Sequence, residues 1–388
     1  MNMMTIKEDK DINISSKIKN FLNPDYVYIP IPNNYKICVN TNDDIYKEDI
    51  LLSSNIDNIY SPVSGKIIGE SDNLTVFNNN VKCLVIENNY EEKLRNNRPA
   101  TKYINKYKKD EFLDLITKYK ACNEDFTSNY KTILINGIDP DPYEKTRSFI
   151  IDAYSDKLLE TVDAIRTIFN INNTYLCINN NDTNNVINLS SNIGTYPNIK
   201  LKLMPDIYPL GFREILIKNA LSKREINDGV LVINIEDIYN IYNVLKRKKP
   251  ISEKLVTISG DVIEQPLVVN AKIGTSMADI IKNTCKVTDD KYYVIVNGLI
   301  SGITLNSLNS IYTNDIRSIF LNTKDESRES ECINCGLCNE KCPMHLNPKY
   351  LITHKKADRS KCIHCGLCTY LCPAKINFKK YLGGKDEQ

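Results

Sequence analysis

Two cysteine runs near the end of the chain constrain its fold more than any other feature of the sequence. Both follow the pattern C-x2-C-x2-C-x3-C-P, and together they place eight cysteines between Cys332 and Cys372. A secreted disulfide scaffold would spread its cysteines through a short chain, whereas this chain has 388 residues and crowds them into its last sixth. The crowding therefore indicates metal binding. The runs read Cys332-Ile-Asn-Cys335-Gly-Leu-Cys338-Asn-Glu-Lys-Cys342-Pro343 and Cys362-Ile-His-Cys365-Gly-Leu-Cys368-Thr-Tyr-Leu-Cys372-Pro373.

This spacing is that of bacterial ferredoxins with two 4Fe–4S clusters. Three thiolates at this interval wrap one face of a cubane, and Gly336 and Gly366 permit a tight backbone approach. Pro343 and Pro373 redirect the chain after the fourth cysteine. In such ferredoxins the fourth cysteine of each run binds the other cluster, which keeps the clusters close enough for electron transfer. We therefore predict one cluster on Cys332, Cys335, Cys338 and Cys372, and a second on Cys362, Cys365, Cys368 and Cys342.

Zinc is the first alternative for such a segment. Zinc sites use pairs of C-x2-C with four ligands per ion, so a third cysteine at the same interval does not fit. A second alternative is a pair of clusters that only braces the fold, although tandem clusters favour electron relay. The histidines all lie in this segment, and for His364, inside the second run, we prefer a solvated loop position to a role in setting cluster potential. They are His345, His354 and His364.

The remaining composition argues against several classes of protein. With 50 basic and 48 acidic residues the formal charge is only +2, unlike a nucleic-acid binder. Apolar runs such as Val230–Ile233 and Val294–Val296 have the length of strands, far below the ~20 residues of a spanning helix. The polar start, Met1 to Lys10, lacks the apolar core of a signal peptide. We therefore expect a cytoplasmic protein with no membrane span and no nucleic-acid partner.

The pattern of apolar segments predicts a multidomain α/β plus β chain. Short apolar strands alternate with Asn/Asp-rich turns from Tyr26 to Glu87, as in a small barrel-sandwich-hybrid-like β domain. From Asp110 helices and strands alternate, which predicts a Rossmann-like α/β domain with a largely parallel sheet. After Ile251 a smaller unit resembles a β-grasp (SLBB-like) module. The predicted units are 1–100 (barrel-sandwich-hybrid-like), 101–250 (α/β), 251–325 (β-grasp) and 326–388 (two-cluster ferredoxin-type).

The order of these parts resembles one family over nearly the whole chain: the RnfC proteins of the Rnf electron-transport complex, related to the 51-kDa flavin-binding subunit of respiratory complex I. The motifs that carry the resemblance are Ser61-Pro-Val-Ser-Gly-Lys66, Ile135-Asn-Gly-Ile-Asp-Pro-Asp-Pro-Tyr143, Tyr208-Pro-Leu-Gly211, Val256-Thr-Ile-Ser-Gly260, Lys272-Ile-Gly-Thr275 and the segment from Cys332 to Pro373.

The resemblance implies that residues 101–250 correspond to the FMN/NADH-binding domain of RnfC. It also implies partners that are redox proteins: a flavoprotein, a ferredoxin, subunits of a membrane complex or a soluble reductase. Peripheral association with the inner face of the cell membrane follows from the family alone. A related group is PrdC, the RnfC-like protein associated with proline reductase, but no residue here singles out that partner.

The sequence departs from the family where a nucleotide would bind. RnfC-like proteins carry a Gly-rich loop whose backbone amides approach phosphates. The equivalent stretch here, 120–129, has no glycine and contains Glu124 and Asp125, which repel phosphate. The family's glutamate motif has become Asp139-Pro-Asp141-Pro. The sequence therefore argues against FMN and NADH, leaving the domain as a docking scaffold, and it singles out no catalytic residue. Cys122 in the same loop is either a redox-active thiol or an inert cysteine, and we prefer the latter.

The sequence is compatible with three functions. The preferred one is an electron-transfer subunit that relays electrons through two clusters between a reduced carrier or flavoprotein and a reductase or membrane complex. The second is an FMN-dependent NADH dehydrogenase subunit. The third is an assembly adaptor with structural clusters.

Overall fold

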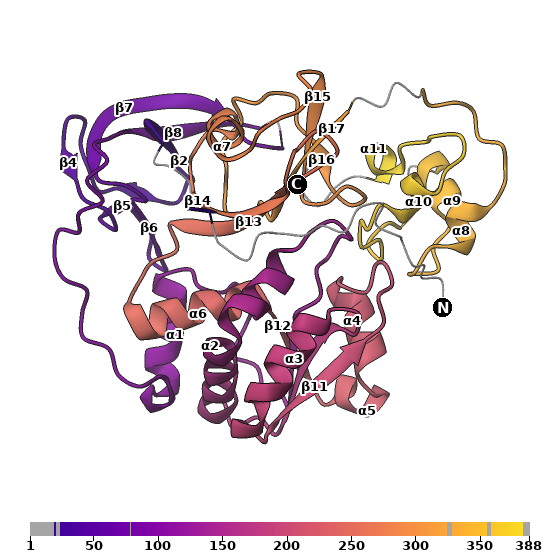
Figure 1. Cartoon of the computed structure of the whole chain (residues 1–388), viewed down its shortest axis with the longest axis horizontal. Helices are drawn as coiled ribbons and strands as arrows, with labels where there is room; N and C mark the ends of the chain where they lie inside the picture. Colours follow the sequence, from indigo (N-terminus) through magenta and orange to yellow (C-terminus); the bar gives the residue numbers. More distant parts are fainter. Residues whose placement is uncertain (1–18, 21–23, 78, 324–327, 355–357, 383–388) are drawn as a thin grey trace.

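The computed structural model describes residues 19–20, 24–77, 79–323, 328–354 and 358–382. Figure 1 shows a layer of helices and parallel strands in the lower half and the strands of the other sheets above it. The cysteine-rich segment lies at one end of the molecule, beside both halves. No helix in the described part of the chain combines the length and apolarity that a membrane crossing requires. The expectation about Met1 to Lys10 concerns residues outside the described ranges.

Two small antiparallel sheets form the N-terminal part. Apolar and polar residues alternate in its first strand, so Val27 and Ile29 are buried in a core that they share with Leu84 and Ile86. The longest strand of this part, Gly65–Leu74, pairs with its last strand, Asn80–Asn88, over nearly its whole length. The first sheet contains β2 (Tyr26–Pro30), β8 (Asn80–Asn88), β7 (Gly65–Leu74) and β4 (Asp44–Ile45), and the second contains β3 (Lys36–Ile37), β5 (Ile50–Ser53) and β6 (Asn58–Tyr60).

The predicted parallel sheet is confirmed, in the order β11-β10-β9-β12. The central strand β9 is buried throughout, as expected for a strand covered on both faces. Its alternating side chains serve two cores: Ile133 and Ile135 pack toward α1, α2 and α6, whereas Leu134 packs toward α4. The strands are β9 (Thr132–Asn136), β10 (Asn173–Asn179), β11 (Ile199–Met204) and β12 (Val230–Asn234).

Two helices of this layer have clear end signals in the sequence. One, α3 (Thr183–Asn192), follows an Asn-rich run at residues 179–185, and the Asp182 side chain accepts a hydrogen bond from the Asn185 amide and so caps the helix. The other directly follows β12 and carries acidic residues in its first turn and basic residues in its last, which suits the helix dipole. The helices are α1 (Lys109–Lys118), α2 (Thr146–Ile168), α3 (Thr183–Asn192), α4 (Arg213–Ala220), α5 (Lys223–Asn227) and α6 (Ile235–Arg247).

A mixed six-stranded sheet, in the order β1-β14-β13-β17-β15-β16, forms the third part. Helix α7 (Met277–Thr284) begins after Ser276, whose hydroxyl accepts from the Asp279 amide. Strand β1, near the start of the chain, pairs in parallel with β14 at the edge of this sheet. The strands are β1 (Lys19–Asn20), β13 (Glu253–Ser259), β14 (Leu267–Lys272), β15 (Tyr292–Val296), β16 (Ile303–Thr304) and β17 (Ser318–Thr323).

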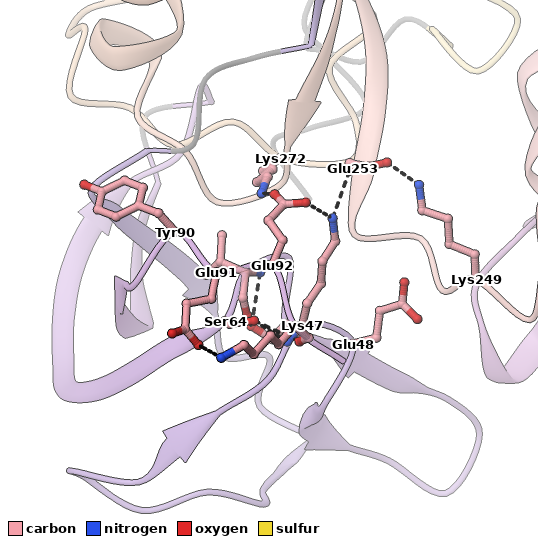
Figure 2. Close-up of polar contacts among 12 residues, drawn as sticks. Lys47, Glu48, Ser64, Tyr90, Glu91, Glu92, Lys249, Glu253 and Lys272 are labelled. Atoms are coloured by element: carbon pink, nitrogen blue, oxygen red, sulfur yellow. Dashed lines mark hydrogen bonds and ion pairs between the residues drawn. The ribbon is translucent and has the colours of Figure 1, made fainter. Parts of the chain in front are cut away.

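An ionic network joins the N-terminal sheets to this third sheet (Figure 2). Lys47 forms ion pairs with Glu92 at 2.8 Å and with Glu253 at 3.9 Å. Glu92 is also paired with Lys272, whose side chain is only 5% exposed, and Lys249 pairs with Glu253. Because Lys47 and both carboxylates share partners, the two parts are held by a connected network rather than by isolated surface pairs.

The cysteine-rich segment is an internal repeat. Equivalent residues of the two runs adopt positive φ angles: Asn334 and His364 at 59° and 52°, and Gly336 and Gly366 at 78° and 75°. Each run therefore follows the same backbone path around its cysteines. The helices are α8 (Leu337–Glu340), α9 (Pro348–Thr353), α10 (Leu367–Tyr370) and α11 (Phe378–Leu382).

Candidate metal centres

Two cavities in the cysteine-rich segment are each lined by four cysteines. We call the first the outer cavity; it has a volume of about 130 Å³, and its lining includes Lys349 and Phe378. The second, the inner cavity, is lined in addition by His364, Lys379 and Leu382. Each cavity combines three cysteines of one run with the fourth of the other, which is the grouping that the spacing predicts. The outer set is Cys332, Cys335, Cys338 and Cys372, and the inner set is Cys342, Cys362, Cys365 and Cys368.

The cysteine sets surround space instead of closing on one point. Among the described residues, no three His, Cys, Asp or Glu side chains are gathered closely enough to hold a single metal ion. A tetrahedral zinc site would need its four ligands around one ion. Each cavity instead offers four thiols around a shared space.

Burial of the inner cysteines disfavours bare thiolates. Burial, together with the neighbouring Cys342 and Cys362 groups, raises the pKa of the Cys365 thiol to about 12. Cys368 behaves in the same way, with burial again raising its pKa to about 12. Like charges in a dry cavity are costly, whereas bound metal cations deprotonate thiols outright. The inner set therefore suits a group that brings positive metal ions.

The two halves of the repeat differ sharply in their surroundings. A Cβ on Gly366 would lie 2.9 Å from the carbonyl carbon of Ile300, in the loop between β15 and β16, whereas nothing lies within 4 Å of one on Gly336. The Tyr208 hydroxyl donates a hydrogen bond to the Cys365 carbonyl. Leu367 is 1% exposed whereas its counterpart Leu337 is half-buried, and Ile333 is 63% exposed whereas its counterpart Ile363 is half-buried. The second run, which supplies most of the inner cavity's cysteines, is thus packed against the rest of the molecule. The first run, around the outer cavity, is more exposed to solvent.

The histidines are distributed unevenly. His345 and His354 are exposed, and His354 stacks on Tyr350 with 3.9 Å between ring centroids. His364 is half-buried and lines the inner cavity. His364 keeps the predicted loop position and is only partly solvated, because one side of it lines the inner cavity.

Helix α2 follows the carboxyl end of the central strand β9, and the start of such a helix is where an α/β domain commonly binds a phosphate. Here the chain's own Asp139 carboxylate occupies this helix end. It accepts hydrogen bonds from the Arg147 amide at 2.8 Å, the Ser148 amide at 3.3 Å and the Ser148 hydroxyl. Two of the amides that would bind an anion are already bonded, so these residues do not fit a phosphate.

The segment that replaces the Gly-rich loop is packed rather than open. Phe126 is buried and lies 5.5 Å from Phe112 and 5.3 Å from Phe169 between ring centroids. Glu124 pairs with Arg213 at 2.6 Å. The Asp125 carboxylate accepts from the amide and hydroxyl of Thr127 and from the Ser128 hydroxyl. The loop is thus held by hydrogen bonds among its own side chains and by the ion pair between Glu124 and Arg213.

Cys122, in the same loop, lacks the features of a reactive thiol. Its side chain is half-buried. Burial is the main cause that raises the pKa of its thiol, and the nearby Asp237 carboxyl raises it as well. A reactive cysteine needs a lowered pKa and access to solvent. The inert alternative therefore fits its surroundings better.

Comparison with protein families matches two segments of this chain. Residues 113–244 match the Nuo51 FMN-binding domain, and residues 331–376 match the 4Fe-4S dicluster domain. The FMN-binding match suggests FMN, in opposition to the prediction from the loop residues. The dicluster match agrees with the prediction of two 4Fe–4S clusters.

Several curated proteins resemble the chain. The C subunit of the proton-translocating ferredoxin:NAD(+) oxidoreductase complex of Clostridium ljungdahlii is 25% identical over 360 residues, covering 84% of this chain and 78% of the relative. The C subunit of the ion-translocating oxidoreductase complex of Buchnera aphidicola is 24% identical over 362 residues, covering 86% and 76%. The corresponding protein of Serratia proteamaculans is 25% identical over 231 residues, and the matched region spans only 33% of its length.

A solved structure shows a weaker similarity. A chain of an NAD+-reducing NiFe-hydrogenase in the H2-reduced state superposes with a TM-score of 0.44 and 12% identity, over 60% of this chain and 46% of that one. The curated relatives therefore carry the comparison. They confirm the resemblance to RnfC proteins over most of the chain, and with the dicluster match they support an iron–sulfur electron-transfer subunit of an oxidoreductase complex.

Proposed function

We propose that this RnfC-like chain relays electrons through two 4Fe–4S clusters. The observation that carries the proposal is the pair of four-cysteine cavities, each drawing its cysteines from both runs. The proposed ligands are Cys332, Cys335, Cys338 and Cys372 for the outer cluster and Cys342, Cys362, Cys365 and Cys368 for the inner cluster.

The clusters would supply one-electron transfer, and the chain's own residues set the conditions for it. The crossing of Cys342 and Cys372 between the cavities ties the two centres into one unit. The buried Leu367 and the Tyr208 hydrogen bond to Cys365 fix the inner set against the body and limit its contact with water. These contacts favour a defined position for the inner centre over a loosely tethered one.

The exposed half of the repeat is the proposed meeting place with a redox partner. Cys332 and Cys335 are exposed, so an electron can leave or enter there over a short distance when another protein docks. A flavoprotein, a ferredoxin, a component of a membrane complex or a soluble reductase such as proline reductase would suit this surface. Peripheral binding at the inner face of the cell membrane is proposed from the relatives alone.

For the α/β domain, we propose a docking scaffold that does not bind FMN at the start of α2. The self-bonded Asp139 and the packed loop around Phe126 support this assignment. The alternative, an FMN-dependent NADH dehydrogenase subunit, is favoured by the match of residues 113–244 to an FMN-binding domain. The finer layout of a barrel-sandwich-hybrid-like domain and a β-grasp module is likewise part of the proposal.

The test is anaerobic purification of the full chain with joint analysis of iron, sulfide and released flavin, followed by EPR of the reduced protein. The proposal expects about eight irons, as two four-iron clusters require, with an interacting spin signal and no flavin. Stoichiometric FMN that NADH reduces would instead establish the dehydrogenase alternative. Clusters that resist reversible reduction would favour the structural-adaptor alternative.

A further inference from the structure

Lys379 is a half-buried cation in the wall of the inner cavity. It belongs to α11 and lines the cavity together with Cys365 and Cys368. Its side chain therefore places a basic group beside the inner cysteines.

The ammonium is held in place by the body of the protein. It donates hydrogen bonds to the carbonyl of Gly302 at 2.6 Å and to the carbonyl of Ser301. The same loop is fixed in turn by the Asp141 carboxylate, which accepts from the amides of Ile300 at 2.9 Å and Ser301 at 3.3 Å. A charge fixed before the reaction acts on a new charge without a further cost of reorganisation.

The repeat supplies a matched position in the outer cavity. Lys349 stands at the same interval after Cys342 as Lys379 does after Cys372, and it lines the outer cavity. Its ammonium, however, bonds to the side chain of Asn334, an exposed residue. Both lysines are half-buried, but solvent and salt screen a charge bonded to an exposed side chain more strongly than one bonded to half-buried backbone carbonyls.

We propose that Lys379 raises the reduction potential of the inner cluster, and does so more than Lys349 raises that of the outer cluster. The inference rests on the proposed function. Reduction adds one electron to a centre that already carries four thiolates, and no bond forms or breaks. A fixed cation nearby stabilises the reduced form, since net charge and hydrogen bonding are among the factors that set cluster potentials.

The test is a potentiometric titration of the full chain, monitored by EPR, for the wild type and the variants K379Q, K379R and K349Q. We expect K379Q to lower the reduction equilibrium constant of one cluster about tenfold, which is about 59 mV for a one-electron couple. K379R keeps the charge and should keep the potential near the wild-type value. K349Q should shift the other cluster, and by less.

Several outcomes would overturn the inference. They are unchanged potentials in K379Q, equal shifts in K379Q and K379R, or a single midpoint that responds to both K379Q and K349Q. Loss of iron in K379Q but not in K379R would assign the charge to cluster assembly and not to the potential. A wild-type protein without two reducible clusters would refute the proposed function itself, so the two failures are distinguishable.

Discussion

Substituting alanine at Gly366 should weaken the attachment of the inner half of the repeat, and the same change at Gly336 should not. Both glycines have left-handed backbones, with φ of 75° and 78°, so alanine costs about 1–2 kcal/mol at either site. Only at Gly366 would the new Cβ overlap the Ile300 carbonyl, 2.9 Å from its carbon atom. Forcing extra volume into a packed site adds about 1–3 kcal/mol.

The expected difference between G366A and G336A is therefore about 1–3 kcal/mol, because the backbone cost cancels. The assay is anaerobic urea unfolding of the full chain, with the visible absorbance of the clusters as the signal. G366A should lose this absorbance at a clearly lower urea concentration than G336A. Equal midpoints would refute the reasoning, since they would mean that the Ile300 loop does not hold the second run in place.

The remaining predictions concern ligand assignment, a buried ion pair and a buried carboxyl. C342S should leave the same residual EPR signal as C365S, and C372S the same as C335S; pairing within each run instead would contradict the crossed assignment. E236Q should destabilise the chain by about 3–5 kcal/mol in urea unfolding, because it leaves Arg147, only 5% exposed, without its ion-pair partner. As a control, D228N removes the exposed ion pair with Arg224 and should change stability by less than about 1 kcal/mol. Burial raises the pKa of Glu144 to about 7, so its folded form binds a proton that the unfolded chain has released, and stability should fall as pH rises from about 4.5 to about 7. E144Q should flatten that part of the stability profile, and an unchanged slope would show that other groups cause it.

The grouping of the cysteines around the two cavities could be predicted from sequence because the spacing is that of two-cluster ferredoxins, in which the fourth cysteine of each run joins the other set. The spacing within each run fixes how three of its cysteines face one cavity. The parallel sheet was equally accessible, since buried strands such as Thr132–Asn136 alternate with helical segments. The Asn-rich run concealed α3, because the same residues favour turns and helix caps.

The unequal surroundings of the two runs could not be predicted. Gly336 and Gly366 stand in nearly the same local sequence, and only the distant loop at Ile300 makes one of them a point of contact. Lys349 and Lys379 also occupy equivalent positions in the repeat, and only their neighbours in the folded chain differ. The pairing of β1 with β14 is also a long-range contact that no local pattern reveals. Tertiary neighbours decide these features, and the sequence carries no nearby signal of them.

The second run packs against the body of the protein, whereas the start of the first run is exposed. This difference has a consequence for how such a protein evolves. Residues around Cys332 and Cys335 contribute little to the packing of the body, so their replacement puts few constraints on folding. The second run can stay packed in the same position while surface residues of the first run are replaced. Under the proposed function, a small number of surface exchanges around Cys332 and Cys335 would therefore be enough to change which redox partner docks there.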